Sequence, residues 1–473
     1  MAMEELASYK GHIVAFPLPL QGHINPMLIL CKALVSLGFS VTFVNAESNH
    51  KRLLAHISAA PSTGIDFVPI PDHLDTPIAT VDVHNSNNLL LVRNTVRKMR
   101  ADFESVLKNI VSNVKVKFIL SEMSVGWTQE TADKFGIPKV TLFTESAASL
   151  SIQYHIPELL AKKHAPVRQG CPDLQSIDYL PGFPLMTTAD IPYSLSAHAE
   201  KLDPGFAQRV ERKKVLLKAK CVLVNSFDAL EHGVFAGLRA KFHQTVVPVG
   251  PLLPPAFLGT ENGSNKPTTL PGMWPADDTC KQWLDRQQDG TVLYVSFGSN
   301  ATLTMDDFVR LARGLGLCKQ LFLWVVRPTL VPGSSLDELL KVVRRNSIYE
   351  GQSCTVSWAP QLQVLLHPAV GWFVTHCGWN STLESICAGV PMLCWPLTAE
   401  QNLNCKFIAD EWKIGVRLLD DSRCIEEVIT GVVESQGDSQ MKTKVKKLKE
   451  AAIKESKLIT KTIDDALSSK SRS

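Results

Sequence analysis

No run of apolar residues in this sequence is long enough to cross a membrane, although 45% of its 473 residues are hydrophobic. A spanning helix needs about 18 or more consecutive apolar residues. The apolar stretch 26–37 is interrupted by Lys32 and is expected to form a buried helix. Residues 1–10 contain two glutamates and no apolar segment, so no secretory signal is expected. We therefore predict a cytoplasmic protein without membrane insertion.

An excess of one charge is also missing. The chain has 49 lysine and arginine residues against 46 aspartate and glutamate residues, which leaves a formal charge of +3. A balance this even gives no sign of nucleic-acid binding. The hydrophobic fraction and the 20% of charged residues are usual for a folded protein, and a chain of this length is expected to form two domains. We expect a monomer.

Several motifs that define common protein classes are absent. The eleven cysteines are odd in number and no two are spaced as C-x-x-C, which argues against a disulfide framework and against a zinc site. No G-x-G-x-x-G follows the first predicted strand, and G-x-x-x-x-G-K-[ST], G-x-S-x-G and H-E-x-x-H do not occur. Dinucleotide binding, P-loop phosphoryl transfer, esterase chemistry and zinc proteolysis therefore lose their usual support. We expect no metal and no cofactor.

Short apolar runs alternate with helical patterns in both halves of the chain. Most of the runs are apolar on both faces, as parallel strands covered by helices are. The predicted strands are residues 13–17, 41–45, 67–70, 118–121, 140–143 and 221–226, then 292–297, 322–326, 355–358, 372–375, 391–395 and 415–418. The predicted helices include residues 27–37, 87–114, 305–315, 382–388 and 401–411. This alternation predicts two doubly wound α/β domains.

A stretch rich in proline, glycine, serine and asparagine separates the two halves. It predicts domains at residues 1–250 and 281–455, joined by a linker at 251–280 that holds no regular structure. The stretch 441–461 is helical in pattern and rich in lysine, which is typical of a solvated helix face.

His23 belongs to the segment F-P-L-P-L-Q-G-H-I-N-P, which follows the first predicted strand. Asn25 suits a helix N-cap and Pro26 the first helical position, so His23 is expected in the loop at the carboxyl end of the strand, where open α/β sheets bind ligands. The helix dipole disfavours imidazolium there, so we expect a neutral imidazole that acts as a general base. Glu122, at the end of another strand, is the candidate carboxylate that orients it. The alternative is a surface loop histidine.

The stretch W-F-V-T-H-C-G-W-N-S-T-L-E, residues 372–384, leads from a strand through a glycine turn into a helix. Ser381 and Glu384 have the spacing of a capping box. The backbone N–H groups of such a helix start can bind a phosphate, and His376 is placed to donate to its oxygens. The stretch predicts a diphosphate site, with an ordinary capped helix as the alternative.

Other strand ends carry residues suited to stacking and to hydrogen bonds with a ligand. Ser299 closes the glycine loop S-F-G-S. Trp358, in W-A-P-Q, is placed to stack on a base, or else packs in the core. Glu400 and Gln401 are placed to bind sugar hydroxyls, or else stabilise the first turn of a helix.

The residues from Trp358 to Gln401 read W-A-P-Q…H-P…G-x-F-x-T-H-C-G-W-N-S-T-L-E-S…G-V-P…W-P…E-Q. This stretch resembles the signature box of the plant UDP-sugar-dependent glycosyltransferases that act on small molecules, glycosyltransferase family 1. The ordered motifs P-x-x-x-Q-G-H-x-N-P, L-V-N-S-F, V-G-P-L, W-L-D and S-F-G-S extend the resemblance over the whole chain. It implies the GT-B fold, with two Rossmann-like domains facing each other across a cleft, and a C-terminal helix at about 456–473 that crosses back onto the first domain.

The resemblance also implies a role for each site residue. His23 matches the catalytic base of the family, with Glu122 beside it. Trp358 and Ala359 are implied to bind the uracil, and Gln361 and Glu384 the ribose. The residues implied to bind the diphosphate are Ser299, His376, Gly378, Asn380 and Ser381. Those implied to bind the sugar are Thr144, Trp379, Glu400 and Gln401. The final glutamine of the box resembles that of glucose users. The family usually has Asp where this chain has Glu122, and residues 330–351 also fit the pattern poorly and are expected as a surface loop and helix.

The expected reaction is the inverting, metal-independent transfer of glucose from UDP-glucose to a hydroxyl or carboxyl group of a small lipophilic acceptor. His23 would take the proton of the acceptor, and the helix start at Asn380 would meet the charge of the leaving UDP. A non-catalytic UDP-sugar-binding homologue and a different Rossmann-type enzyme are the alternatives.

The acceptor pocket is expected in loops of the N-terminal half, which are the most variable kind of segment. The candidate loops are residues 84–93, 146–155 and 187–198. Phe143, Tyr154 and His155 either line such a pocket or pack in the core. Phenolic, terpenoid and carboxylic acid acceptors all remain open.

Overall fold

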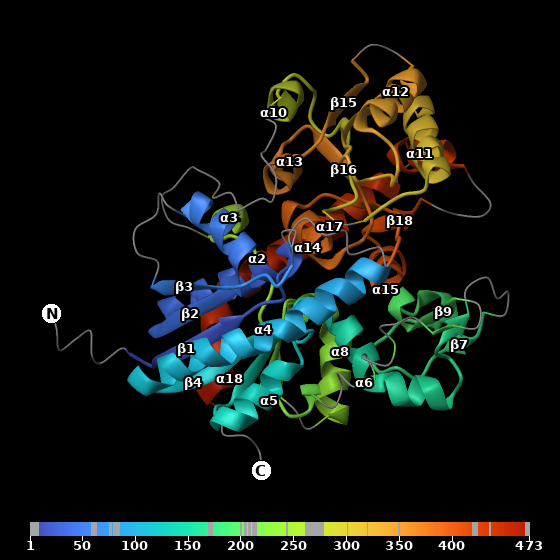
Figure 1. Ribbon diagram of the computed structural model, residues 1–473. Coiled ribbons are helices and arrows are strands. Elements are labelled where there is room, and N and C mark those ends of the chain that lie inside the picture. The colour runs from blue at the N-terminus through green and yellow to red at the C-terminus, as the bar shows by residue number, and fades with distance from the viewer. Residues whose placement is uncertain are drawn as a thin grey trace.

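Two parallel β-sheets, one in each half of the chain, form the framework of the computed structural model (Figure 1). The structure describes residues 9–57, 64–74, 78, 86–168, 174–198, 201–202, 206, 210, 215–242, 245–260, 279–299, 301–318, 320–348, 351–418, 424–434 and 437–468. The two sheets with helices packed around them are the predicted doubly wound α/β architecture.

The N-terminal sheet has seven strands in the order β12-β11-β5-β4-β1-β2-β3. Its strands are β1 (Gly11–Phe16), β2 (Phe39–Ala46), β3 (Ile65–Ile70), β4 (Val116–Glu122), β5 (Lys139–Phe143), β11 (Cys221–Val224) and β12 (Val246–Pro248). All neighbouring strands pair in parallel. The chain order reverses at β1, which lies between β2 and β4, and ligands of open α/β sheets bind at such a switch point.

Helices cover both faces of this sheet. They are α2 (Gln21–Ser36), α3 (Glu47–Ile57), α4 (Ser86–Asn113), α5 (Trp127–Phe135), α6 (Ala147–Ala161) and α8 (Asp228–Lys241). Successive side chains of a strand point to opposite faces. In β1, Ile13 and Ala15 therefore pack in one cluster with α2, whereas Val14 and Phe16 pack in another with α4. This double burial explains why the strand is apolar throughout.

Shorter elements complete the N-terminal half. They are the strands β6 (Val167–Arg168), β7 (Ser176–Ile177), β8 (Met186–Thr187), β9 (Ser196–His198) and β10 (Lys201–Leu202), and the 3-10 turns η2 (Thr188–Asp190) and η3 (Tyr193–Leu195).

The C-terminal sheet has six parallel strands in the order β15-β14-β13-β16-β17-β18. They are β13 (Val292–Ser296), β14 (Leu321–Val325), β15 (Ser353–Val356), β16 (Val370–Thr375), β17 (Met392–Cys394) and β18 (Gly415–Arg417). The helices around it are α10 (Thr279–Leu284), α11 (Met305–Leu317), α12 (Leu336–Asn346), α13 (Gln361–Leu366), α14 (Trp379–Ala388), α15 (Gln401–Lys406) with the π-helical turn η4 (Phe407–Glu411), and α16 (Ile425–Glu434). Here the order reverses at β13, between β14 and β16.

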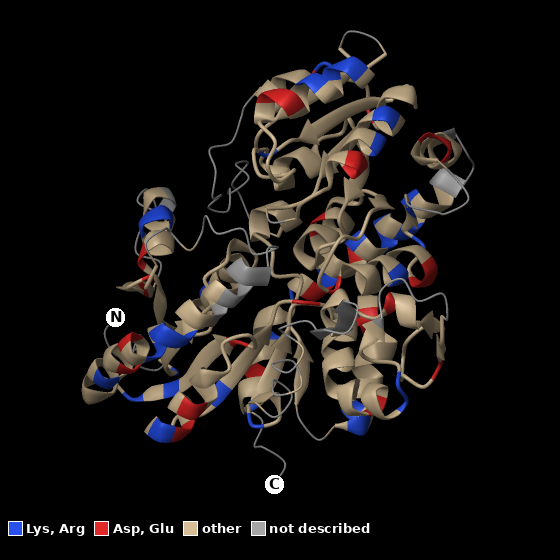
Figure 2. Cartoon of the chain, turned by 45° about the vertical axis from the view of Figure 1, so that its right-hand side comes forward, with Lys and Arg blue, Asp and Glu red and all other residues tan. Residues whose placement is uncertain are grey.

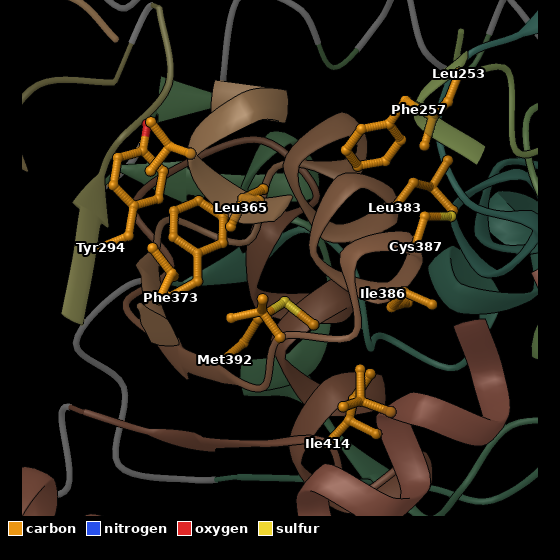
Figure 3. Close-up of a cluster of buried hydrophobic side chains, with 14 of the residues drawn as sticks. Leu253, Phe257, Tyr294, Leu365, Phe373, Leu383, Ile386, Cys387, Met392 and Ile414 are labelled. Atoms are coloured by element: carbon orange, nitrogen blue, oxygen red, sulfur yellow. The ribbon is translucent and has the colours of Figure 1, made fainter. Parts of the chain in front are cut away.

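One face of the C-terminal sheet is covered by a large apolar cluster that includes α14 (Figure 3). Tyr294 of β13 stacks on Phe373 of β16, with ring centroids 5.1 Å apart. Leu383 of α14 and Phe257 belong to the same cluster and lie near each other in Figure 3. This core fixes α14 on the sheet, and with it the residues at the start of that helix.

The linker prediction was wrong in its first part. Residues 251–260 are described, and they include the helical turn α9 (Pro255–Leu258). Leu253, Phe257 and Leu258 are buried in the cluster beneath the C-terminal sheet. Proline favours the first position of a helix, and burial of the apolar side chains holds the turn in place. Residues 261–278 lie outside the described residues.

The chain ends with two helices that return to the N-terminal half. α17 (Gly437–Ser456) packs against α14 and α8, and α18 (Ile459–Ser468), red in Figure 1, packs against α2 and β12. The carboxylate of Glu455 accepts from the backbone N–H groups of Asp228 and Ala229, both at 2.8 Å. Lys10 pairs with Asp464 at 2.6 Å. The predicted crossing back is confirmed, but the predicted helical stretch 441–461 is divided between α17 and α18.

All twelve predicted strands are confirmed, with ends that differ by one to two residues in most cases. β12 and the short strands β6 to β10 were missed, because two- and three-residue strands carry little hydrophobic pattern. The helix expected within residues 330–351 is α12. Basic and acidic residues are mixed over the helices of both halves (Figure 2). Among the described residues, no helix has the length and apolar character of a membrane span.

Candidate active site

Helix α2 begins earlier than the sequence predicted. Its first residue is Gln21 and its N-cap is Leu20, so His23 lies in the first turn of the helix and not in a loop. The backbone carbonyl of Leu20 already accepts from the backbone N–H of His23 at 2.9 Å. Asn25 and Pro26 therefore do not mark the helix start; both lie inside the helix.

His23 lies between two other predicted site residues. Its Nδ1 is 3.0 Å from the hydroxyl of Thr144, which directly follows β5. The same atom is 3.7 Å from Oε1 of Glu122, the last residue of β4. That separation is longer than a hydrogen bond but short enough for a strong charge interaction. β4 pairs with both β1 and β5, so the expected closeness of these strand ends is confirmed.

The charge environment of His23 is opposite to the one expected. Burial lowers the pKa of His23, but the carboxylate of Glu122 raises it, and Glu145 and Glu400 add to this effect. The net result is a pKa above the ordinary value of 6.5. The helix dipole was expected to disfavour the imidazolium, but the pKa shift has the opposite direction, because Glu122, Glu145 and Glu400 favour the charged form.

Glu122 is held by the turn that follows its strand. Its side chain is 2% exposed, and Oε2 accepts from the backbone N–H of Ser124 at 2.6 Å. One carboxylate oxygen is thus fixed by the backbone, while the other faces His23. Glutamate has one methylene more than aspartate, and in this turn its Oε1 lies 3.7 Å from Nδ1 of His23.

The N-terminal and C-terminal halves meet directly beside His23. The side-chain amide of Asn380, on α14, donates to the backbone carbonyl of Gly22 at 2.8 Å. In a regular helix the carbonyl of Gly22 would accept from the N–H group four residues later, which is position 26. Pro26 has no N–H group. The proline inside α2 therefore leaves this carbonyl available to the other half of the protein.

His376 lies between two glycines at the switch point of the C-terminal sheet. It follows β16, and its side chain is close to Gly298, in the loop after β13, and to Gly378. A Cβ atom at Gly298 would lie 2.7 Å from Cε1 of His376, and one at Gly378 would lie 2.4 Å from Nε2. Only glycine fits at either position without displacing the imidazole.

The start of α14 differs from the predicted capping box. The N-cap is Gly378, and no side chain caps the helix. Ser381 and Glu384 lie three and six positions beyond this N-cap and interact with Gln361 instead. Since the first backbone N–H groups of a helix have no partner within it, the uncapped start of α14 offers donors and a positive dipole end to an anion.

Gln361, the first residue of α13, links the residues expected at the ribose. Its Nε2 donates to Ser381 Oγ at 3.0 Å and to Glu384 Oε2 at 2.6 Å. Its Oε1 accepts from the hydroxyl of Tyr294 at 3.2 Å. Burial raises the pKa of Glu384 to about 7, although the hydrogen bond from Gln361 opposes this shift. The carboxyl group of Glu384 is therefore poised between its two protonation states near neutral pH.

Two loops flank this group of residues. Trp358 is partly exposed and Ala359 is buried, both between β15 and α13. The backbone carbonyl of Ser299 accepts from the buried guanidinium of Arg327 at 2.9 Å, and the same guanidinium donates to the carbonyl of Ala301. Arg327 thus fixes the loop after β13.

The predicted sugar-binding residues differ in how their side chains are used. Trp379 is 3% exposed, and its indole N–H donates to the backbone carbonyl of Asn225 at 2.6 Å, so its side chain joins the two halves. The side-chain oxygen of Gln401 accepts from the backbone N–H groups of Leu397 and Thr398, both at 2.9 Å. These bonds leave the NH₂ group of Gln401 for a ligand. Glu400 is the N-cap of α15 and is partly exposed.

The candidate acceptor residues fall into three groups. Phe143, Tyr154 and His155 are buried, and the last two contact the ring of Phe242, which favours core packing. The loop at 187–198 contacts the C-terminal half through Asn402, whose NH₂ group donates to two of its backbone carbonyls. Residues 84–85 and the side chain of Arg93 lie outside the described residues.

Three contributing residues were missed by the sequence reasoning. Arg327 follows β14, and a search of every strand end for charged residues would have found it. Asn225 lies within the L-V-N-S-F motif, and its Oδ1 accepts from the backbone N–H of Leu252 at 2.8 Å. Glu145 directly follows Thr144 and contributes to the charge around His23. No local pattern distinguishes it from a surface glutamate.

Comparison with known proteins agrees with this architecture. The sequence model of the family described as "UDP-glucoronosyl and UDP-glucosyl transferase" matches residues 274–450. UDP-glycosyltransferase 85A5 of Arabidopsis thaliana is 34% identical over 449 residues, which are 92% of this chain and 91% of that protein. The (R)-mandelonitrile beta-glucosyltransferase of Prunus dulcis is 35% identical over 462 residues, 93% of this chain and 91% of that protein.

Among solved structures, Phytolacca americana UGT2 complexed with UDP-2fluoro-glucose and pterostilbene is 27% identical. It superposes with a TM-score of 0.77 over 97% of this chain and 99% of that one. The protein has two Rossmann-like sheets, and the loops at their switch points lie next to each other. Together with the likeness to this structure, they define a glycosyltransferase of the GT-B fold. The chain belongs to the UDP-glycosyltransferase family, and its relatives place it among the plant members, glycosyltransferase family 1.

Proposed function

We propose that this protein transfers glucose from UDP-glucose to a hydroxyl group of a small lipophilic acceptor, with inversion at the anomeric carbon. His23 is the general base, and the start of α14 binds the diphosphate. The reaction needs no metal, and the protein acts as a monomer in the cytoplasm. Membership of the family supports the reaction class, and so does the name of the relative from Prunus dulcis (the almond relative), which is a glucosyltransferase.

The observation that carries this proposal is the hydrogen bond between Asn380 and the carbonyl of Gly22, at 2.8 Å. It places the uncapped start of α14 next to the residue that precedes His23. A diphosphate bound at α14 and a base at His23 would therefore be close enough to act on one sugar, and in the proposed reaction they act on its opposite sides. In-line displacement requires this arrangement, because the acceptor must attack from the side opposite the leaving UDP.

The proton step rests on the two nitrogens of His23. Nδ1 faces the hydroxyl of Thr144 and the carboxylate of Glu122. With its hydrogen directed to this side, Nε2 is the basic nitrogen and accepts the proton of the acceptor hydroxyl as the oxygen attacks. The negative field of Glu122 then stabilises the imidazolium that forms.

The leaving group is stabilised by neutral donors and a helix dipole. The backbone N–H groups at the start of α14 and the imidazole of His376 donate to the diphosphate oxygens, and Ser299 adds a hydroxyl from the loop after β13. Donors fixed before the reaction stabilise developing charge without reorganisation. These groups supply the electrostatic role that a divalent cation has in other phosphate chemistry.

Nucleoside and sugar recognition follow from the neighbouring residues. Trp358 and Ala359 are placed for the uracil ring and its edge. Gln361 and Glu384 form a hydrogen-bonded pair suited to the two ribose hydroxyls. The NH₂ group of Gln401, with the carboxylate of Glu400, is suited to glucose hydroxyls, and the side chain of Trp379 supports this region through its bond to Asn225.

The charges near His23 favour a hydroxyl acceptor over a carboxylic acid. Glu122, Glu145 and Glu400 all raise the pKa of His23, so the reacting position lies in a negative field. A carboxylate acceptor would be repelled there and would have no proton for His23 to remove. The almond relative is named for (R)-mandelonitrile, a small aromatic alcohol, and the Phytolacca enzyme was solved with pterostilbene.

The test is direct. The purified protein is incubated with UDP-glucose and pooled phenolic, terpenoid and carboxylic acid acceptors, in the presence of a chelator, and products with an added hexose are detected by mass spectrometry. We expect a product with a hydroxyl acceptor, and a β-glucoside by NMR. A product with retained configuration, or one that forms only after a metal is added, would contradict the proposed mechanism.

The distance between His23 and Glu122 favours one alternative, a homologue that binds UDP-sugars without turnover. A carboxylate 3.7 Å from Nδ1 orients the imidazole less strictly than one at hydrogen-bonding distance. This alternative predicts UDP binding by calorimetry with no product from any acceptor pool. Recovery of product in Glu122→Asp would then show that the geometry of this pair is the cause.

A further inference from the structure

Three cysteines that are far apart in the sequence meet beneath the proposed donor site. Cys377 follows β16, Cys394 ends β17 and Cys405 lies on α15. Their Sγ atoms all lie within 4.8 Å of one another, and all three side chains are fully buried. No local pattern indicates this cluster, because the cysteines are 17 and 11 positions apart and form no C-x-x-C pair.

The backbone at Cys377 adopts an uncommon conformation. Cys377 has φ 64°, in the left-handed region that glycine adopts without strain and other residues adopt at a cost. The two residues around it in the donor loop are His376 and Gly378. Its Sγ lies within 4.8 Å of the other two sulfurs, and its S–H donates to the backbone carbonyl of Thr375 at 3.7 Å.

We propose that Cys377, Cys394 and Cys405 form a binding site for one soft d10 cation, held through three thiolate sulfurs. Soft thiolate ligands select Cu⁺ and Zn²⁺ among the common metal ions. Three sulfurs at a Zn–S distance of about 2.3 Å stand roughly 3.8–4.0 Å from one another. The sulfurs therefore need to move by less than about 1 Å to bind such an ion.

The binding step is a simple exchange of protons for a metal. Three S–H bonds break, three metal–sulfur bonds form, and three protons leave to the solvent. With a divalent ion the site then carries one negative charge. Arg417 lies opposite Cys394 on the adjacent strand β18 and supplies a positive charge on this side of the cluster. Arg417 also forms ion pairs with Asp190 and Asp410, and both carboxylates pair with Lys406 as well.

An ion at this site would join the end of β17 to two segments that carry proposed donor-site residues. Cys377 is next to His376, and Cys405 lies on the helix whose N-terminal residues are Glu400 and Gln401. The side-chain amide of Asn404, the residue before Cys405, donates to the backbone carbonyl of Cys377 at 2.9 Å. Because the ion binds the folded chain and not the unfolded one, occupancy should raise the thermal stability of the protein.

The test uses the reduced full-length protein and Cd²⁺, a soft d10 ion whose thiolate complexes absorb in the ultraviolet. We expect a sulfur-to-cadmium charge-transfer band that saturates at one ion per chain, together with a rise in melting temperature. Cys394→Ser and Cys405→Ser should each lose the band. The controls Cys387→Ala, a buried single thiol on α14, and Cys424→Ser, an exposed thiol, should both retain it.

A second measurement does not depend on how the variants fold. X-ray absorption of the cadmium-loaded wild-type protein should show three sulfur neighbours. Oxygen or nitrogen neighbours alone, the absence of a band at stoichiometric Cd²⁺, or a band retained in both serine variants would overturn the proposal. Competition by Zn²⁺ and by Cu⁺ then shows which ion displaces Cd²⁺ at the lower concentration and is the preferred occupant.

Discussion

The two switch points of this protein have the same topology but opposite chemistry. At the N-terminal one, between β1 and β4, the site consists of titratable side chains, with Glu122 beside His23. At the C-terminal one, between β13 and β16, it consists of glycines and an uncapped helix start around His376. One surrounds a histidine with negative charge, and the other surrounds a histidine with donors for an anion.

In the proposed function, this difference lets one fold support two halves of a reaction. A parallel sheet supplies only a place where loops converge. Carboxylates near the first histidine make it more basic, which suits proton removal. Space without side chains near the second allows a diphosphate to approach the backbone. On this proposal the chemistry is set by which residues occupy equivalent loops, and we expect that each half can be disabled separately.

The largest effect is expected from His23→Ala. Loss of a general base should lower the rate of transfer by about 10² to 10⁴-fold. UDP binding, measured by calorimetry, should be unchanged, because the nucleotide is held by the other half. The matched control is His232→Ala, an exposed histidine on α8. If His23→Ala abolished UDP binding as well, the assignment of separate tasks to the two halves would be wrong.

The corresponding change in the C-terminal half is Gly378→Ala. The new Cβ would lie 2.4 Å from Nε2 of His376, so the imidazole must move away from the diphosphate. We expect UDP to bind about tenfold more weakly or worse, which corresponds to about 1.4 kcal/mol. Gly431→Ala is the control, since nothing lies within 4 Å of its added Cβ. Equal UDP affinities in the two variants would contradict the steric argument.

The C-terminal site could be predicted from the sequence far better than the N-terminal one. Apart from Ser299, its residues lie between Trp358 and Gln401, and strand, turn and helix signals follow one another there. The use of their side chains was less predictable. The spacing of Ser381 and Glu384 suggested a cap, but both bind Gln361, because the N-cap is Gly378 and both residues therefore lie inside the helix.

The N-terminal site was predicted in its members but not in its electrostatics. His23 lies in the first turn of α2, Glu122 ends β4 and Thr144 directly follows β5, and only the sheet order brings them together. Local reasoning assigned the pKa of His23 to a helix dipole. The actual balance includes Glu145 and Glu400, and the second of these comes from the other half of the chain. No local pattern contains such a contribution.

The pH dependence of transfer would sharpen this point. His23 must be neutral to accept a proton, and its pKa is raised, so activity should fall as the pH decreases through that raised value. In Glu122→Gln the carboxylate charge is lost, and the acidic limb of the kcat/KM profile should move to lower pH. The plateau should fall by roughly tenfold or more, because the imidazolium loses its counter-ion.

Glu145→Gln provides the comparison for that experiment. Glu145 contributes less than Glu122 to the pKa of His23, so its variant should move the acidic limb in the same direction but by less. An acidic limb that stays in place in Glu122→Gln would show that another group controls the profile.

The smallest effect concerns the contact between the two halves. In Pro26→Ala the new N–H group can donate to the carbonyl of Gly22, in competition with Asn380. Weakening one hydrogen bond of about 0.5–1.5 kcal/mol should lower kcat/KM for UDP-glucose by roughly two- to tenfold. Thermal stability should not fall, because alanine suits a helix interior better than proline. Activity and stability would thus move in different directions.

A double-mutant cycle separates this coupling from a general disturbance of α2. If Pro26→Ala acts by competing for the carbonyl of Gly22, it should have no further effect once Asn380→Ala has removed the competitor. If the effect of Pro26→Ala persists in full in the Asn380→Ala background, the proline acts on the orientation of His23 alone. The contact at Gly22 would then join the two halves mechanically without helping to align base and donor.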